Sequence, residues 1–168
     1  MLEQEITISF VPTVLAEQLL YMPWPARTAL RTLLTGADLL HRRPPKGAPF
    51  VLINNYGPTE CTVVATSGMV SADSEVSGPP PIGTAIDNTS TLILDESMRP
   101  VHDGQAGELC LGGAHVGRGY RNNPQLTAGK FVTIQPPAVQ TSGSTEPATA
   151  PGGCLLARLR SWGAWMTW

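Results

Sequence analysis

The chain has 168 residues, a formal net charge of −2 and a pI near 5.9, so it lacks the basic surface that binds nucleic acid. Only 14% of its residues are charged, and it contains neither an apolar run long enough to cross a membrane nor a basic-then-apolar leader. Its three cysteines are widely spaced without a Cys-x-x-Cys pair, which argues against a disulfide framework and a metal site. We therefore expect a cytoplasmic protein that binds neither nucleic acid nor a membrane.

The first part of the chain alternates short strand and helix patterns. Residues 5–11 place apolar side chains at every second position, which predicts a strand, and residues 14–20 carry leucines at helical spacing. A short helix is predicted at 26–30. Residues 33–38 are typical of a buried strand that ends at a glycine, and a helix is expected through residues 39–40. This alternation predicts an α/β fold.

The most informative stretch follows, with the sequence Asn-Asn-Tyr-Gly-Pro-Thr-Glu at residues 54–60. It comes directly after the apolar run 50–53 and before a second β-rich run at 62–66. Glycine and proline end the first strand. Because ligands of α/β sheets gather beyond the carboxyl ends of strands, this loop is a candidate binding site.

Three side chains of this loop offer complementary chemistry. The ring of Tyr56 can stack on a base, the hydroxyl of Thr59 can donate to a phosphate, and the carboxylate of Glu60 can hold Mg²⁺ against that phosphate. Taken by itself, the loop is also compatible with a surface turn that has a satisfied threonine and a solvated glutamate.

The second part of the chain has a different pattern. A Gly/Pro-rich break at 77–81 is followed by short strand patterns at 91–94 and 108–111, separated by turn residues. No helical period returns until Gln125. Residues 79–132 therefore predict a small β unit.

The last part of the chain has the composition of a linker. Residues 133–153 are rich in Pro, Thr, Ser, Ala and Gly and carry one charge, which predicts disorder. The chain then ends with Trp162, Trp165 and Trp168. We interpret residues 133–168 as an unrelated tail that is disordered or arises from a frameshift, a misread splice site or a degenerate gene end.

The motif at 54–60 and the segment Gly-Glu-Leu-Cys-Leu-Gly-Gly-Ala-His-Val-Gly-Arg-Gly-Tyr-Arg-Asn-Asn-Pro-Gln-Leu-Thr-Ala-Gly-Lys-Phe at 107–131 together closely resemble the adenylation domains of non-ribosomal peptide synthetases. These domains belong to the adenylate-forming, AMP-binding superfamily. Two further stretches agree, Pro-Ile-Gly-Thr-Ala-Ile-Asp-Asn-Thr at 81–89 and Phe-Val-Pro-Thr at 10–13. The resemblance runs continuously over about residues 5–132.

The resemblance implies both an architecture and a reaction. Residues 1–78 would be the β/α part of the large adenylation subdomain, residues 79–132 its small β-barrel part, and residues 133–168 the unrelated tail. The family joins an amino acid to MgATP and releases aminoacyl-AMP and pyrophosphate. The implied cofactors are ATP and Mg²⁺, and the implied partner is a carrier domain whose phosphopantetheine lies outside this chain.

The resemblance also assigns roles to individual residues. Tyr56 would lie against the adenine ring, Asn54 would accept from its amino group, and Gly36 with Ala37 would pack on the other face. A helix-start turn is the alternative explanation for Gly36. The implied ATP-binding set is Gly36, Ala37, Asn54, Asn55, Tyr56, Gly57 and Thr59.

Two residues are implied to act in catalysis. Thr59 would contact the α-phosphate, and Glu60 would coordinate the Mg²⁺ that neutralises charge during the attack. Tyr120 stands out in the second motif, and we expect it to be a structural residue of the β unit.

The amino-acid pocket implied by the resemblance is aliphatic. Its positions are Ser9, Leu34, Gly36, Asn55, Val63 and Val64. None of these would pair with a charged substrate, so the set favours leucine, with only a weak preference over isoleucine or valine because a methylene is worth about 1–3 kcal/mol. The aspartate that holds the α-amino group would lie upstream of Met1.

Several functional elements of the family do not occur in the sequence. The phosphate loop and the ribose-binding segment are missing, no aspartate follows Asp103, and the two lysines, Lys46 and Lys130, stand outside the expected contexts. Two hypotheses therefore remain. The chain is either part of an enzyme that activates an aliphatic amino acid or a non-catalytic remnant that at most binds adenine or a partner weakly.

Overall fold

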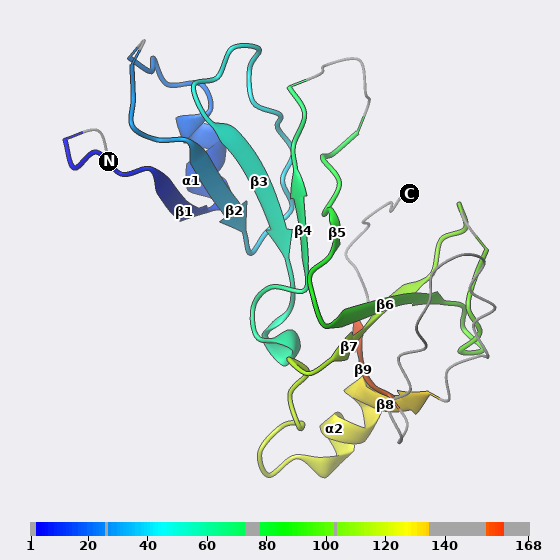
Figure 1. The fold of residues 1–168 in the computed structure, drawn as a ribbon. Coiled ribbons are helices and arrows are strands. Elements are labelled where there is room, and N and C mark those ends of the chain that lie inside the picture. Colours follow the sequence, from blue (N-terminus) through cyan, green and yellow to red (C-terminus); the bar gives the residue numbers. More distant parts are fainter. Residues whose placement is uncertain (1–2, 26, 73–77, 103, 135–153, 160–168) are drawn as a thin grey trace. The chain divides into compact units, whose positions relative to one another are not determined.

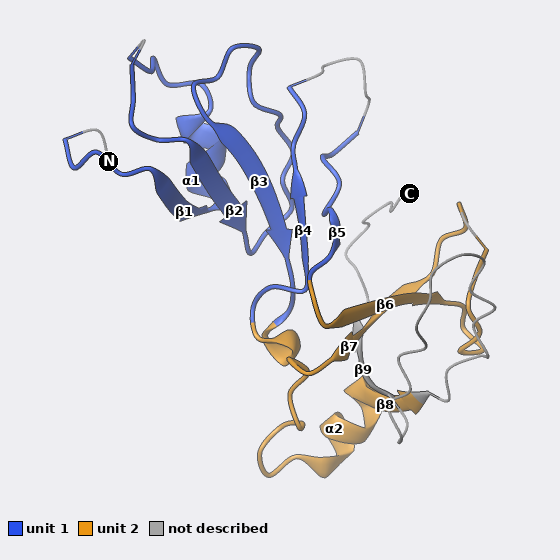
Figure 2. Cartoon of the chain, viewed as in Figure 1, with its two compact units in different colours: residues 1–58, 63–86, 167 blue, residues 59–62, 87–166, 168 orange. Residues whose placement is uncertain are grey.

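The computed structural model describes residues 3–25, 27–72, 78–102, 104–134 and 154–159 (Figure 1). They form two compact units, which Figure 2 shows in different colours. The first comprises Met1–Pro58 and Val63–Ile86, and the second comprises Thr59–Thr62 and Asp87–Met166. The short segment 59–62 thus belongs to the second unit although it follows a strand of the first. In the ranges described, no helix is both long and apolar enough to span a membrane.

The first unit is built on a five-stranded mixed sheet. Its strands lie in chain order and are β1 (Ile8–Pro12), β2 (Thr32–Gly36), β3 (Val51–Tyr56), β4 (Thr66–Met69) and β5 (Thr84–Ala85). The first three are parallel, whereas β4 pairs antiparallel with β3 and β5 pairs antiparallel with β4. Helix α1 (Thr13–Leu19) connects β1 to β2 and lies beside them (Figure 1).

One face of this sheet carries the core of the unit. Its buried members are Leu20, Leu30, Leu33, Leu40, Phe50, Leu52 and Val70. The ring of Trp24 closes the cluster with its edge against Phe50, at 5.0 Å between ring centroids. Because side chains alternate along strands, the other face holds the exposed apolar residues Ile8, Phe10, Val51 and Met69, each more than 40% exposed.

The second unit contains an antiparallel four-stranded sheet in the order β6 (Thr89–Leu94), β7 (Glu108–Gly113), β9 (Cys154–Leu159) and β8 (Phe131–Ile134). Helix α2 (Pro124–Lys130) precedes β8. Asn123 caps this helix by accepting a hydrogen bond from the Leu126 amide at 3.0 Å, and Pro124 occupies its first turn, so the start of the helix follows from local sequence. The short 3-10 helix η1 (Thr59–Cys61) belongs to the same unit.

The predicted α/β class and the small β portion are confirmed, but two predicted helices are wrong. Residues 27–30 of the helix expected at 26–30 are not helical, and Ala26 lies outside the described residues. Here the Leu30 amide donates to the Thr28 hydroxyl at 3.2 Å, a local bond that competes with helix formation. Residues 39–40 are also irregular, because the Asp38 carboxylate accepts from the Leu39 amide at 2.7 Å.

The β-rich run predicted at 62–66 becomes a strand only at its end. Strand β4 begins at Thr66, whereas Thr62 and Val63 have φ angles of 51° and 77°. This left-handed backbone is incompatible with a strand and is costly for a β-branched residue. The β propensity of the run is therefore overridden by the loop that it closes.

The boundaries of the units and the tail also differ from expectation. Strand β5 pairs with β4, so the first unit extends to Ile86 rather than to residue 78. In the tail predicted to be disordered, residues 154–159 form β9 between β7 and β8. Its sequence, Cys-Leu-Leu-Ala-Arg-Leu, is an apolar run without Pro or Gly, which suits a central strand. The tail segments 135–153 and 160–168 lie outside the described residues.

Candidate functional site

The ends of β2 and β3 lie side by side at one edge of the first sheet. Both strands are parallel, so their carboxyl ends place Gly36 beside Asn55. A Cβ on Gly36 would lie 2.5 Å from the Asn55 carbonyl oxygen, a distance at which no side chain fits. The need for glycine here thus comes from the approach of two strands, and the alternative of a helix-start turn does not apply, because no helix follows.

The turn after β2 is fixed by the first residue of α1. The buried Thr13 hydroxyl lies 2.9 Å from the Gly36 carbonyl oxygen and 3.1 Å from that of Asp38, and it can donate to either. Between them Ala37 is exposed and has a φ of 79°. The two residues predicted to pack on adenine therefore lie at the end of β2 and in the turn that follows it, both held by a side chain 23 or more residues earlier in the chain.

Asn54 and Tyr56 lie on the same face of β3 because they are two residues apart. Asn54 is 4% exposed, and its amide nitrogen donates to the Pro81 carbonyl at 3.0 Å, which fixes the orientation of the amide. Tyr56 is half-buried and pairs across the sheet with Thr66, whose hydroxyl donates to the Ile82 carbonyl at 2.7 Å. Both bonds hold the segment at 81–82 against this end of the sheet.

The loop after Tyr56 is tight and strained. A Cβ on Gly57 would lie 2.6 Å from the Ala65 nitrogen and 2.7 Å from the Val63 oxygen. The Ala65 amide in turn donates to the Tyr56 carbonyl at 2.8 Å, which closes the loop. The positive φ of Val63 belongs to this closure, and its side chain is 68% exposed. Strain of this kind is typical of functional loops.

The strand register separates one predicted pocket residue from the others. Leu34, Gly36 and Asn55 share a sheet face, because Leu34 is level with Ile53 and the strands continue in step. Ser9 is level with Leu33 and therefore lies on the opposite face. The residue of β1 that is level with Leu34 is Phe10, which the resemblance to the family does not select and which only the register identifies.

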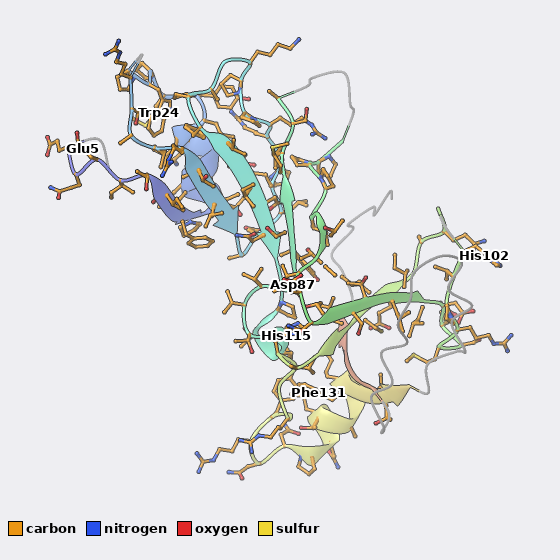
Figure 3. All side chains as sticks on the ribbon, viewed as in Figure 1. Glu5, Trp24, Asp87, His102, His115 and Phe131 are labelled. Carbon is orange, nitrogen blue, oxygen red and sulfur yellow. The ribbon has the colours of Figure 1, made fainter. Side chains whose placement is uncertain are left out.

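Thr59 and Glu60, the predicted catalytic pair, lie in η1 of the second unit. The Glu60 carboxylate accepts a hydrogen bond from the Tyr120 hydroxyl, and the Glu60 carbonyl accepts from the Gly117 amide at 2.7 Å. The sequence predicts a purely structural role for Tyr120. Its ring does pack edge-on against Phe131, labelled in Figure 3, at 5.5 Å, but its hydroxyl reaches the carboxylate.

Two residues close to the Glu60 carboxylate have raised pKa values. The hydrogen bond to Glu60, then burial and the negative charge of Glu60 raise the pKa of Tyr120 from 10.0 to about 12. Burial raises the pKa of the adjacent Cys61 thiol from 9.0 to about 11, with a smaller effect from the charge of Glu60. Both groups are therefore uncharged near neutral pH, and Glu60 is the acidic group of η1.

The donor set at Glu60 fits magnesium that arrives with a nucleotide. Across the residues placed by the structure, no three His, Cys, Asp or Glu side chains gather into a metal-binding group. Magnesium in nucleotide sites is held by one or two carboxylates together with substrate phosphates, so a single glutamate is a sufficient protein ligand there. A resident metal ion held by protein groups alone would not fit Glu60.

The first unit also contains a cavity of about 270 Å³. Its lining includes Leu20, Trp24, Lys46 and Pro49, and none of the predicted site residues contributes to it. The cavity is thus separate from the ends of β2 and β3.

Comparison with known proteins identifies the family of the chain. The model of the family described as AMP-binding enzyme matches residues 1–121. A subunit of the linear gramicidin synthase of Brevibacillus parabrevis is 54% identical over 132 residues, which cover 79% of this chain and 3% of that protein. Surfactin synthase subunit 2 of Bacillus subtilis (strain 168) is 47% identical over 127 residues, which cover 76% of this chain and 3% of that protein.

A solved structure extends the likeness to the fold. It is that of an NRPS protein containing adenylation and PCP domains, with a TM-score of 0.72 and 27% identity, covering 94% of this chain and 30% of the other. The chain thus spans only a small part of the length of the relatives that it matches. It belongs to the AMP-binding enzyme family and corresponds to part of an adenylation domain of the nonribosomal peptide synthetase type.

Proposed function

We propose that this chain supplies the adenine-binding and magnesium-binding residues of an amino-acid adenylation site. The reaction is the joining of an amino acid to MgATP, with release of aminoacyl-AMP and pyrophosphate. The observation that carries the proposal is the meeting of β2 and β3 at Gly36 and Asn55, directly before the loop that leads to Thr59 and Glu60. Ligands bind at this end of such sheets, and the loop offers the matching chemistry.

The adenine ring is proposed to lie between Tyr56 and the backbone of Gly36 and Ala37. An aromatic face on one side and an exposed backbone turn on the other would form a slot for a flat base. The Asn54 amide, whose nitrogen is engaged by Pro81, presents its oxygen as the acceptor for the adenine amino group. Polar recognition and stacking would then come from one strand and one turn.

The phosphate end of the nucleotide is proposed to meet Thr59 and Glu60. The Thr59 hydroxyl donates to the α-phosphate, and the Glu60 carboxylate holds Mg²⁺. When bound, the metal would neutralise charge on the oxygens of the α-phosphate, whose phosphorus the substrate carboxylate attacks as pyrophosphate leaves. The contribution of the chain is positioning and electrostatics, which are the main sources of rate enhancement in such reactions.

The amino acid activated by the intact site is proposed to be aliphatic, with leucine preferred. Leu34, Gly36 and Asn55 share a face at the strand ends, and the loop adds Val63 and Val64. No ionisable side chain occurs in this set. A charged substrate side chain would be buried without a partner, which costs several kcal/mol.

The chain alone is proposed not to complete the reaction. Its lysines, Lys46 and Lys130, do not stand in the family's catalytic context, and the chain covers only 3% of the length of the gramicidin and surfactin synthase subunits that it matches. A weakly binding, non-catalytic product is therefore the second candidate function. In a complete synthetase, the partner would be a carrier domain with phosphopantetheine. The synthetase would be cytoplasmic, and its product would be a secondary-metabolite peptide.

Nucleotide binding by the 168-residue chain tests the proposal. We expect MgATP to bind weakly in calorimetry or ligand-observed NMR and Tyr56→Ala to weaken binding roughly tenfold or more, since base stacking is worth about 1–3 kcal/mol. Tyr21→Ala, outside the site, is the matched control. Equal binding by the Tyr56→Ala variant and the wild type would contradict the adenine site.

Catalysis is tested by amino-acid-dependent exchange of pyrophosphate into ATP. We expect no exchange above a blank without protein. Exchange with leucine that is abolished by Glu60→Gln would show that the chain is an active enzyme by itself.

A further inference from the structure

We propose that Tyr120 is a positioning residue that orients the Glu60 carboxylate for magnesium. The inference rests on the proposed role of Glu60 as the metal ligand, and it adds a residue from the second sequence motif to the site. The two residues are 60 positions apart in sequence but lie in one compact unit.

The hydrogen bond engages one oxygen of the carboxylate. The Tyr120 hydroxyl donates to Oε1 of Glu60. A hydrogen bond from a neutral hydroxyl to a carboxylate is among the stronger side-chain bonds because one partner is charged. It restricts rotation of the carboxylate and leaves Oε2 as the oxygen that can bind a metal with a single contact.

The backbone around Glu60 is held by the same loop that carries Tyr120. The Gly117 amide donates to the Glu60 carbonyl at 2.7 Å, and the Thr62 hydroxyl donates to the carbonyl of His115 at 2.8 Å. His115 is labelled in Figure 3 in the segment that follows β7. These two bonds hold the backbone at Glu60 and directly after η1, which leaves the Glu60 side chain to be oriented by its own contacts.

Tyr120 is itself rigidly placed. Its ring lies edge-on to Phe131, and its amide donates to the Thr127 hydroxyl at 2.9 Å. Gly119 has a φ of 128°, and a Cβ there would lie 2.4 Å from the Thr127 methyl carbon. The loop therefore packs so closely on α2 that the hydroxyl has a defined position before any metal binds.

This arrangement lowers the entropy that Glu60 loses on binding a metal. A glutamate without the bond samples several rotamers and must be ordered by the ion, whereas a carboxylate held by a supporting hydrogen bond is already oriented. We expect loss of the hydroxyl to weaken metal binding through Glu60 roughly tenfold, at the lower end of the range of about 10–100-fold seen when groups that orient a ligand are removed.

The test uses the full chain with Mn²⁺ and ATP, because Mn²⁺ replaces Mg²⁺ and its EPR signal distinguishes bound from free metal. The dissociation constant of the Mn·ATP complex from the protein is measured for wild type, Tyr120→Phe, Glu60→Gln and Tyr21→Phe. Tyr21 provides the matched control, since its ring contacts the Arg42 guanidinium at 5.1 Å and the phenylalanine keeps that ring. Thermal unfolding of each variant is recorded in parallel.

A second readout needs no change at residue 120. The chain has three tyrosines, so ¹³C labelling at tyrosine Cζ gives a simple spectrum in which single Tyr→Phe variants assign the signals. We expect Glu60→Gln to shift the Tyr120 signal without metal. We also expect Mn·ATP to broaden the Tyr120 signal in the wild type and far less in Glu60→Gln.

The outcomes separate this inference from the proposed function. Weaker binding in Tyr120→Phe but not in Tyr21→Phe supports the positioning role. An unchanged dissociation constant in Tyr120→Phe, with only a lower unfolding temperature, shows a structural role and overturns the inference while the metal site stands. If Glu60→Gln binds Mn·ATP like the wild type, or if Mn·ATP does not broaden the wild-type Tyr120 signal, Glu60 is not a metal ligand. Both the proposed magnesium site and this inference are then wrong.

Discussion

The side-chain amide of Asn54 donates to the Pro81 carbonyl at 3.0 Å and so joins the end of β3 to the segment that precedes β5. The residue proposed to recognise adenine is therefore also part of the architecture, because its orientation is set by a backbone group 27 residues away. Recognition and folding are coupled at this position, and changes at Asn54 should be visible in stability as well as in binding.

Replacing Asn54 with alanine is expected to lower the free energy of unfolding by about 0.5–1.5 kcal/mol, since the partly buried hydrogen bond to the Pro81 carbonyl is lost. Urea unfolding followed by circular dichroism measures the change. Asn55→Ala is the control, because it alters the neighbouring amide on the opposite face of the same strand. An equal decrease in the free energy of unfolding of both variants would show that the hydrogen bond to Pro81 does not stabilise the protein.

A methyl group at Gly57 is expected to destabilise the protein by about 1–3 kcal/mol or more, because it would overlap the backbone of Val63 and Ala65. Gly129 in α2 is the matched control, since nothing lies within 4 Å of the position that a Cβ would take there. Gly129→Ala should stabilise the protein by about 0.5–1 kcal/mol through helix propensity. A neutral Gly57→Ala variant would mean that the loop is not as tight as described.

The Cys61 thiol is expected to react slowly with iodoacetamide at about pH 8. Only the thiolate reacts, and burial with the Glu60 charge raises the pKa from 9.0 to about 11. Because the folded state favours the protonated thiol, the stability it contributes is complete below pH 9.0 and is lost as the pH rises through about 11.

Peptide mapping by mass spectrometry after timed alkylation identifies the Cys61 label among the three cysteines. The same protein in urea provides the reference rate for an ordinary thiol. Native Cys61 labelled as fast as in urea at about pH 8 would contradict the raised pKa.

A hybrid in which the missing parts come from a close relative is expected to activate leucine in preference to charged or aromatic amino acids. Leu34 and Val64 narrow the proposed pocket with aliphatic surface, and burial of an unpaired charge costs more than a methylene difference. Competition among amino acids for adenylate formation is the measurement. Preferred activation of glutamate, lysine or arginine would show that the pocket positions are misassigned.

Local patterns are sufficient for most elements of the fold. Period-two alternation predicts β1, and an apolar run bounded by a glycine predicts β2. Local patterns fail where a hydrogen bond between residues close in sequence decides the outcome, as at Thr28 and Asp38, or where loop closure forces Val63 into a left-handed conformation. Such effects depend on single contacts rather than on periodicity.

The site is predictable where one contiguous motif carries it and is missed where distant segments meet. Tyr56 and Glu60 can be selected from the loop alone. The hydrogen bond between Glu60 and Tyr120 joins two motifs that are 60 residues apart. The position of Phe10 beside Leu34 depends on the register of β1 and β2. Neither relationship leaves a signal in the spacing of residues, so only the three-dimensional arrangement reveals it.

Strand β9 has a consequence for how the second sheet is completed. In the part of the chain that the structure describes, it lies between β7 and β8, so β8 joins the rest of this sheet through a strand that follows both of them in the sequence. During synthesis β7 and β8 would both wait with open edges until β9 emerges, and such edges are prone to wrong pairing. Ending the chain before Cys154 should therefore leave β6 and β7 as a hairpin and promote aggregation, although the motif residues 54–60 and 107–131 would all remain.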